Sequence, residues 1–178
     1  MKRELLIGCG NDRTKKIYFD SDEWSNLITM DIDPYCEPDV VHDLEETPWP
    51  FEDNTFDEIH AYDVLEHLGR QGDPVSFFKH FIEMYRILKP GGMIFASCPA
   101  SNSTWVWGDP GHTRYIGPET IVFLDQAEYT KQVGVKQMTD YRRLWKDDFH
   151  CVDFNIEDGD FQFILEAVKP SRIDPKYI

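Results

Sequence analysis

Short apolar segments separated by turn residues run through the first hundred positions of the chain. Segments 5–7, 27–30 and 56–62 have the length of strands, and 40–43 predicts a shorter one. Glycine, proline, aspartate or asparagine follows these segments, and such residues favour turns. The first third of the chain therefore predicts four strands joined by loops.

A helix is predicted after the fourth strand. Asp73 supplies an N-cap and Pro74 a proline at the first helical position. Apolar residues then recur at helical spacing, at Phe78, Phe81, Ile82, Tyr85 and Leu88. Proline and two glycines in 89–92 end this helix, and 93–98 reads as a buried central strand. A strand, a helix and a strand in this order imply a right-handed parallel crossover.

The C-terminal part predicts a helix over 119–130 and a hairpin. Segments 149–156 and 161–168 flank an Asp158-Gly159 step, which is typical of a tight turn between antiparallel strands. Together the elements predict an α/β fold, with a Rossmann-like, mostly parallel sheet, helices on both faces and a C-terminal antiparallel hairpin. Segment 11–25 lacks a helical apolar period, so the first crossover is expected to be short or irregular.

Composition predicts one domain over 1–168 and a loosely held tail over 169–178. The 178 residues are 41% hydrophobic and 14% aromatic, which suffices for one well-buried core. No segment approaches the roughly 20 apolar residues that cross a bilayer, and the chain starts without a signal-peptide pattern, so a soluble, cytoplasmic protein is expected. The net charge of -15 opposes nonspecific binding to nucleic acid or anionic membranes. Small molecules or proteins are the expected partners, and the oligomeric state is left open.

The four cysteines are expected to be free thiols. Cys9, Cys36, Cys98 and Cys151 lie far apart in the chain, without the paired spacing of a zinc site or a disulfide framework. The sequence therefore predicts no metal centre.

The first loop carries the strongest candidate chemistry. Gly8-Cys9-Gly10 follows the first strand, and Asp31 stands at the end of the second. Glycines let the backbone approach a ligand closely, and a carboxylate at the neighbouring strand end can accept both ribose hydroxyls. This arrangement predicts a nucleoside pocket that suits NAD and S-adenosylmethionine alike.

Several motifs in order resemble the class I S-adenosylmethionine-dependent methyltransferases over residues 5–168. Leu5 to Gly10 looks like the first motif of that family, 30–32 like its ribose-binding motif, and 42–44 like its adenine-binding motif. Segments 52–68 and 86–92 are similar to its fourth-strand region and its helix-end signature. The resemblance implies S-adenosylmethionine as cofactor, bound by Gly8, Cys9, Gly10, Asp31, Ile32, Asp43, Leu44, Tyr62 and Asp63.

The chain departs from the family pattern at two positions. Leu6 stands where the first strand often carries an acid, and Asp12 stands where a third glycine is common. The methionine end of the donor is therefore expected to be held differently, through Asp12, Asp63 or backbone groups.

An acceptor lid is predicted after the strand at 93–98. Segment 105–115 combines aromatic, histidine and arginine residues in an irregular stretch. His112 is the candidate general base, with Asp109 and Tyr115 beside it in the catalytic set. His67, Trp107 and Arg114 are the candidate substrate contacts. A structural loop that covers the sheet edge, and a packing or capping role for His67, are the alternatives.

The leading prediction is S-adenosylmethionine-dependent methyl transfer to a small molecule or a protein. A methyltransferase-like binding or scaffold protein without activity remains an alternative because of Leu6, Asp12 and the irregular first crossover. An NAD-dependent oxidoreductase is disfavoured, since 8–13 lacks the third glycine of the dinucleotide fingerprint.

Overall fold

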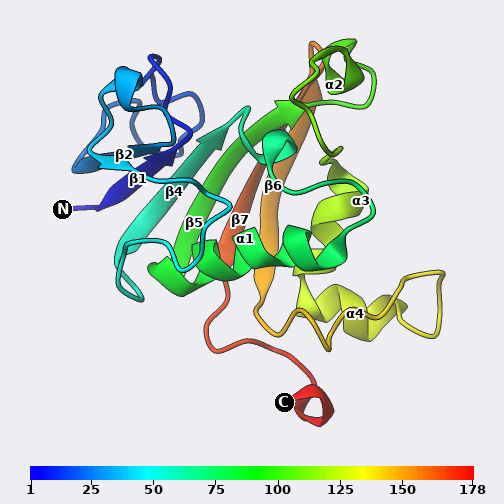
Figure 1. Cartoon of the computed structure of the whole chain (residues 1–178). Helices are drawn as coiled ribbons and strands as arrows, with labels where there is room; N and C mark the ends of the chain where they lie inside the picture. Colours follow the sequence, from blue (N-terminus) through cyan, green and yellow to red (C-terminus); the bar gives the residue numbers. More distant parts are fainter.

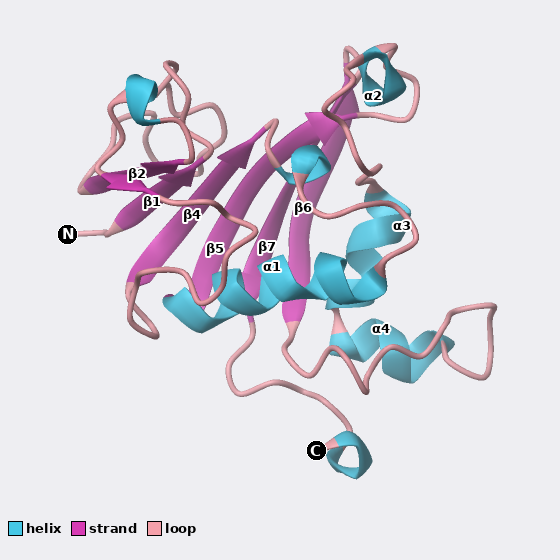
Figure 2. Cartoon of the chain, in the orientation of Figure 1, coloured by secondary structure: helices cyan, strands magenta, loops and turns pink.

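All seven strands of the protein form one sheet, in the order β3-β2-β1-β4-β5-β7-β6. The computed structural model describes residues 1–178 (Figures 1 and 2). The strands are β1 (Glu4–Ile7), β2 (Leu27–Asp31), β3 (Val40–Val41), β4 (Phe56–Tyr62), β5 (Leu88–Pro99), β6 (Phe149–Glu157) and β7 (Asp160–Ala167). β1 to β5 are parallel, whereas β7 runs antiparallel to both β5 and β6. The mostly parallel sheet and its C-terminal hairpin are confirmed.

β5 begins earlier than the sequence predicts, because the turn after the helix is part of the strand. Leu88 pairs with Phe56, and the next pair is Met93 with Glu58, so residues 89–92 bulge out of the ladder. Gly91 adopts φ +74 within this bulge. A left-handed conformation suits glycine, which explains the glycine there.

The helices between β4 and β5 and between β5 and β6 are as follows: η2 (Leu65–His67), α1 (Pro74–Ile87), α2 (Trp105–Gly108), α3 (Pro118–Ile121), η3 (Val122–Leu124) and α4 (Gln126–Gln132). The Asp73 carboxylate accepts a hydrogen bond from Ser76 N at 3.1 Å, which confirms the predicted cap of α1. The helix predicted over 119–130 is broken at Asp125. This residue is extended, and its carboxylate accepts from Ala127 N at 2.7 Å to start α4.

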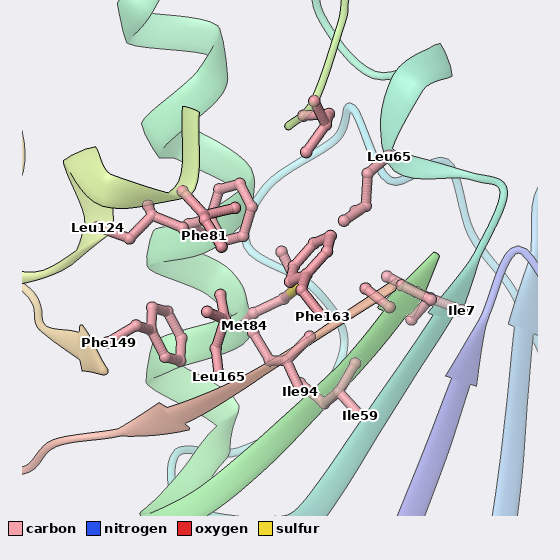
Figure 3. Packing of buried hydrophobic residues seen from close by; sticks show 14 of the residues in the cluster. Ile7, Ile59, Leu65, Phe81, Met84, Ile94, Leu124, Phe149, Phe163 and Leu165 are labelled. Atoms are coloured by element: carbon pink, nitrogen blue, oxygen red, sulfur yellow. The ribbon is translucent and has the colours of Figure 1, made fainter. Parts of the chain in front are cut away.

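The main core lies between one face of the sheet and the helices (Figure 3). Phe81 and Met84 of α1 pack over Ile59 and Ile94 of the central strands, and all four are at most 2% exposed. Burial of each such side chain contributes about 1.5–3 kcal/mol to folding. Leu124 and Phe149 belong to the same core, so α1, η3 and the hairpin form one packed unit.

An irregular segment, residues 11–26, covers β1 and β4 on the opposite face, and it contains no helix. The Trp24 ring meets His60 at 4.8 Å, and the Phe19 ring meets Phe95 at 5.5 Å. The prediction of an irregular first crossover is confirmed, whereas the expected helices on both faces are replaced here by this loop. Its lack of apolar periodicity is the physical reason, since such a segment has no helical face to bury.

Buried charges lie beneath this loop. Lys15 Nζ lies 2.6 Å from Glu4 Oε1 and 3.4 Å from Glu58 Oε2, and all three side chains are at most 7% exposed. A carboxylate buried without a partner is costly, so Lys15 permits the two acids here together with Lys2, whose Nζ lies 2.7 Å from Glu58 Oε1.

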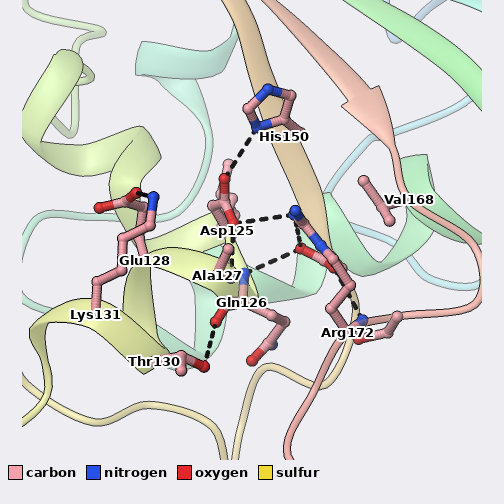
Figure 4. Close-up of polar contacts among 12 residues, drawn as sticks. Asp125, Gln126, Ala127, Glu128, Thr130, Lys131, His150, Val168 and Arg172 are labelled. Carbon is pink, nitrogen blue, oxygen red and sulfur yellow. Dashed lines mark hydrogen bonds and ion pairs between the residues drawn. The ribbon is translucent and has the colours of Figure 1, made fainter.

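The C-terminal residues are anchored rather than loose. Arg172 donates to Asp148 at 2.6 Å and to Asp125 at 3.0 Å (Figure 4). Ile173 is 7% exposed, and η4 (Pro175–Tyr177) ends the chain, where Tyr177 Oη donates to Asp140. The sequence does not reveal these distant partners, which lie 24 to 47 residues away.

No helix of the fold combines the length and the apolar character that a membrane crossing needs. The four cysteines are free, as predicted.

Candidate functional site

The carboxyl ends of β1, β2 and β4 meet at the point where the strand order reverses. β1 pairs with β2 on one side and with β4 on the other. Ligands bind at such a switch point in open parallel sheets, because the loops diverge there and leave a crevice.

The predicted glycine turn lies at this point and uses the left-handed region twice. Gly8 has φ +58 and Gly10 has φ +48. A Cβ on Gly8 would lie 2.5 Å from Val64 Cγ2, whereas a Cβ on Gly10 would meet nothing within 4 Å. Gly8 thus lets the loops after β1 and β4 touch, and Gly10 leaves open space at the turn.

Asp31 is tied to the glycine turn by its side chain. Its two carboxylate oxygens accept hydrogen bonds from Gly10 N at 2.8 Å and from Asp33 N at 2.9 Å. Each oxygen retains a lone pair for a further donor. Next to it, Ile32 is 62% exposed, while Cys9 is buried at 3%. The structure therefore brings the turn and the acid together.

The predicted adenine contacts lie in a tight turn after β3. Asp43 Oδ1 accepts from Glu45 N at 2.9 Å, so this acid caps its own loop. Leu44 is 6% exposed, and its carbonyl accepts from Trp49 Nε1 at 3.0 Å. Leu44 is thus part of the core, and the carboxylate of Asp43 stabilises the turn after β3.

Tyr62 does not lie where a ligand contact was expected. Its hydroxyl accepts from Lys16 N and Ile17 N, each at 3.2 Å, and lies 2.7 Å from His60 Nδ1. Burial raises the pKa of Tyr62 to about 12. The alternation of side chains along β4 directs this ring to the face covered by the irregular loop, so Tyr62 holds that loop in place.

Asp63 directly follows β4 and has φ +54, and its carboxylate accepts from Ser97 Oγ at 3.2 Å. Lys16 Nζ lies 3.8 Å from Asp63 Oδ2 and 3.7 Å from Asp12 Oδ2. This Asp12-Lys16-Asp63 group is partly exposed. Lys16 was missed at the sequence level, because nothing in an irregular crossover marks which lysine folds back toward the fourth strand.

The lid predicted over 105–115 is built on the short helix α2. Trp107 is 63% exposed, whereas Asp109 closes the loop by accepting from Gly111 N at 2.7 Å. Tyr115 N donates to Gln71 Oε1 at 3.1 Å. The tryptophan therefore faces outward, and the other two residues shape the loop.

His67 and His112 face each other, with ring centroids 4.6 Å apart. His67 Nδ1 lies 3.1 Å from the Gly111 carbonyl oxygen, and His112 Nδ1 lies 3.2 Å from that of Val106. Beside them, Glu66 is buried, and burial raises the pKa of its carboxyl to about 7. No role was expected for Glu66 from the sequence, although its position next to His67 was a usable signal.

The guanidinium of Arg114 is buried and bound by neighbouring groups rather than free to meet a ligand. It is 6% exposed and donates to the carbonyls of Leu68 and Arg70 and to Ser76 Oγ at 2.8 to 2.9 Å. Its guanidinium also lies over the Phe77 ring at 5.2 Å. These contacts, which connect η2 to the start of α1, leave Arg114 poorly placed for the predicted substrate contact.

A cavity of 630 Å³ lies between the start of α1, the loop after β5 and α3. Phe77, Phe123 and Tyr141 give it an apolar lining, and its polar lining includes Asp73, Glu119 and the predicted site residues Arg114 and Tyr115. It does not include the glycine turn or Asp31, so it is separate from the crevice at the carboxyl ends of β1, β2 and β4.

The sequence model of a family described as "Methyltransferase domain" matches residues 5–96, which cover β1 to β5 and the helix between β4 and β5. The chain belongs to this family. It is a family of S-adenosylmethionine-dependent methyltransferases, and a search of curated proteins finds no match.

Solved methyltransferases share the fold at low sequence identity. A SAM-dependent methyltransferase from Archaeoglobus fulgidus is 19% identical, with a TM-score of 0.58 over 93% of this chain and 86% of the other. A putative methyltransferase of Haloferax volcanii, solved with the activator Trm112, is 14% identical, with a TM-score of 0.58 over 94% and 83%. The N-methyltransferase NodS from Bradyrhizobium japonicum WM9, solved with S-adenosyl-L-homocysteine, is 14% identical, with a TM-score of 0.55 over 93% and 78%.

Proposed function

We propose that this chain binds S-adenosylmethionine at the crevice between β1, β2 and β4 and transfers its methyl group to a small molecule or a protein. The bond between Gly10 N and Asp31 Oδ2 carries this proposal. It holds the acid over the glycine turn, where the remaining lone pairs of Asp31 can accept both ribose hydroxyls. Gly8, Cys9 and Ile32 contribute backbone and surface around the nucleoside, and Asp43 lies near the adenine end.

The first strand has Leu6 where the family often has an acidic residue, and the Asp12-Lys16-Asp63 group takes the place of that acid. An aspartate can accept from the donor's α-ammonium group, and Lys16 Nζ can pair with its carboxylate. These charges lie at the ends of β1 and β4, on the opposite side of the turn from Asp31. Where the chain departs from the family pattern at Leu6 and Asp12, it therefore offers other charged groups for the methionine end of the donor.

The lid covers the acceptor side in this proposal. A sulfonium donor carries its own activation, so the protein contributes mainly by positioning the two reactants. His112, within the lid, is the candidate base. If its Nδ1 donates to Val106 O, Nε2 is free to accept a proton. Trp107 and His67 line the acceptor, and Asp109 and Tyr115 support the loop. The net charge of -15 disfavours a nucleic acid acceptor.

Thermal melting with S-adenosylmethionine, S-adenosylhomocysteine, NAD or no ligand tests donor binding. Ligand at about 100 times its Kd contributes roughly 2.7 kcal/mol, which raises Tm by about 5–10 °C for a domain of this size. A shift with the sulfur nucleosides alone supports the proposal. A shift with NAD alone indicates an oxidoreductase, and no shift with any nucleoside indicates a scaffold protein.

Asp31→Ala tests the assigned ribose contact. Losing a charged hydrogen-bond acceptor costs about 1.5–3 kcal/mol, so Kd for S-adenosylhomocysteine should rise roughly 10- to 100-fold. Asp22→Ala is the matched control, because Asp22 is an exposed acid of the irregular loop. Isothermal titration should show an unchanged Kd for the control. An unchanged Kd for Asp31→Ala would remove the ribose role.

A further inference from the structure

Three potential metal ligands converge where η2 meets the lid. Glu66, His67 and His112 each offer one ligand atom, and these atoms lie within 4.8 Å of one another. Glu66 and His67 belong to η2 after β4, while His112 follows α2 after β5. Two loops at the carboxyl edge of the sheet thus bring together two imidazoles and a carboxylate.

Both imidazoles have the hydrogen bonds of metal-binding histidines. A backbone carbonyl only accepts, so the contacts of Nδ1 with Gly111 O and Val106 O place the ring proton on Nδ1 in each neutral histidine. Each Nε2 then carries an unshared electron pair. A carbonyl that holds Nδ1–H in this way orients the ring and increases its basicity toward a metal.

The Glu66 carboxylate has no hydrogen-bond partner for either oxygen, although its side chain is only 3% exposed. The nearest cationic candidate is His112, whose Nε2 lies 3.9 Å from Oε1. An ionised carboxylate buried without partners is strongly destabilising, so Glu66 either stays protonated or pairs with a cation that the chain itself does not supply. Glu66 therefore points to a ligand independently of the clustering of the three residues.

The protein also contains a comparison case. Glu4, Glu58 and His60 form the other cluster with metal-like spacing, but Lys15 Nζ already lies between those two carboxylates. That cluster has an internal cation, whereas the Glu66 cluster has none. The Glu4 cluster is therefore a structural ion pair, whereas the carboxylate of the Glu66 cluster has no cationic side chain to pair with it.

We propose that Glu66, His67 and His112 bind a divalent transition-metal ion, with Zn²⁺ as the ion that fits the donor set. Two imidazoles and one carboxylate supply three ligands and leave a position open for water or a ligand atom. His67 is exposed, so solvent reaches this side of the site. Nε2 of His112 cannot bind a metal and accept a proton at the same time, so the base role proposed above applies to the metal-free protein.

Metal titration of the full chain, after removal of bound metal with a chelator, tests the site. We expect one equivalent of Zn²⁺ by isothermal titration, and one equivalent of Co²⁺ with visible absorption bands of a low-coordinate site. Zn²⁺ at about 100 times its Kd should raise Tm by about 5–10 °C. Absence of binding by both ions would overturn the proposal.

Substitutions identify the ligands. Glu66→Gln keeps the shape of the side chain and removes its charge, and His67→Ala truncates an exposed ring, so both variants should fold. Each should weaken binding of Zn²⁺ at least tenfold and remove the Co²⁺ bands, as should His112→Ala. His150→Ala, at an exposed histidine paired with Asp125, should bind both ions like the wild type.

The possible results distinguish the proposed metal site from the proposed donor site. Wild-type affinity in Glu66→Gln and His67→Ala would place the metal elsewhere and overturn the proposal, as would lost binding in His150→Ala. A melting shift with S-adenosylhomocysteine in the metal-free protein reports donor binding separately. Failure of one proposal is therefore distinguishable from failure of the other.

Discussion

Gly8→Ala should be far more damaging than Gly10→Ala, although both glycines have positive φ. A left-handed conformation costs a residue with a Cβ about 1–2 kcal/mol, and both variants incur this cost. Only at Gly8 does the new Cβ meet another atom, at 2.5 Å from Val64 Cγ2 and 2.8 Å from Val64 Cβ. Valine is stiff at χ1, so the overlap forces the backbone to move, at about 1–3 kcal/mol more.

The expected loss of unfolding free energy is thus about 2–5 kcal/mol for Gly8→Ala and about 1–2 kcal/mol for Gly10→Ala. Urea denaturation followed by tryptophan fluorescence measures both, since the chain has 5 tryptophans. The double variant Gly8→Ala with Val64→Ala isolates the overlap. It removes the Cγ2 contact but leaves the Cβ contact, so we expect a partial rescue with a coupling energy of about 1 kcal/mol.

Equal losses for the two alanine variants, or strictly additive effects in the double variant, would refute this reasoning. Either result would show that the loops after β1 and β4 are not packed against each other at Gly8. The distance between these loops sets the width of the proposed donor crevice. The same comparison therefore also checks the geometry on which donor binding rests.

Two further predictions concern the C-terminal part. Arg172→Ala should lower the unfolding free energy by about 2–3 kcal/mol in urea denaturation, because it removes the cationic partner of the fully buried Asp148, whereas Lys176→Ala, at an exposed surface pair, should change it by less than about 1 kcal/mol. Equal effects would show that the tail is not anchored through Asp148. Arg142 lowers the pKa of Asp140 below its ordinary value, so the paired acid stabilises the fold above the unfolded pKa of about 3.8, and this stability is lost as the pH falls below that value. Asp140→Asn should therefore destabilise the protein more at pH 6 than at pH 3, and a pH-independent effect in the same denaturation assay would contradict the assignment.

Local patterns predicted most of the fold because they depend on neighbours in sequence. Asp73 and Pro74 start α1 by capping it, and the β4 bounds follow from the segment between two turns. Glycines at 8 and 10 and the acid at 31 were recognisable because the turn and the strand end require these residue types. The order of motifs then indicated the methyltransferase family, which the match over 5–96 establishes.

Only the tertiary structure decided which face each side chain meets and which charges find a partner. Tyr62 and Arg114 were predicted to contact ligands, but the fold turns one toward the irregular crossover and surrounds the other with carbonyls. Lys16 reaches Asp63 across 47 positions, and no local pattern encodes that contact.

Sequence by itself determined the positions of most strands, the glycine turn and the family, because these follow from local propensity and motif spacing. The structure decided that Glu66, for which the sequence predicted no role, is buried without a hydrogen-bond partner beside His67 and His112. Burial and the absence of a partner are properties of the packed chain. They arise only when residues from distant loops meet at one edge of the sheet.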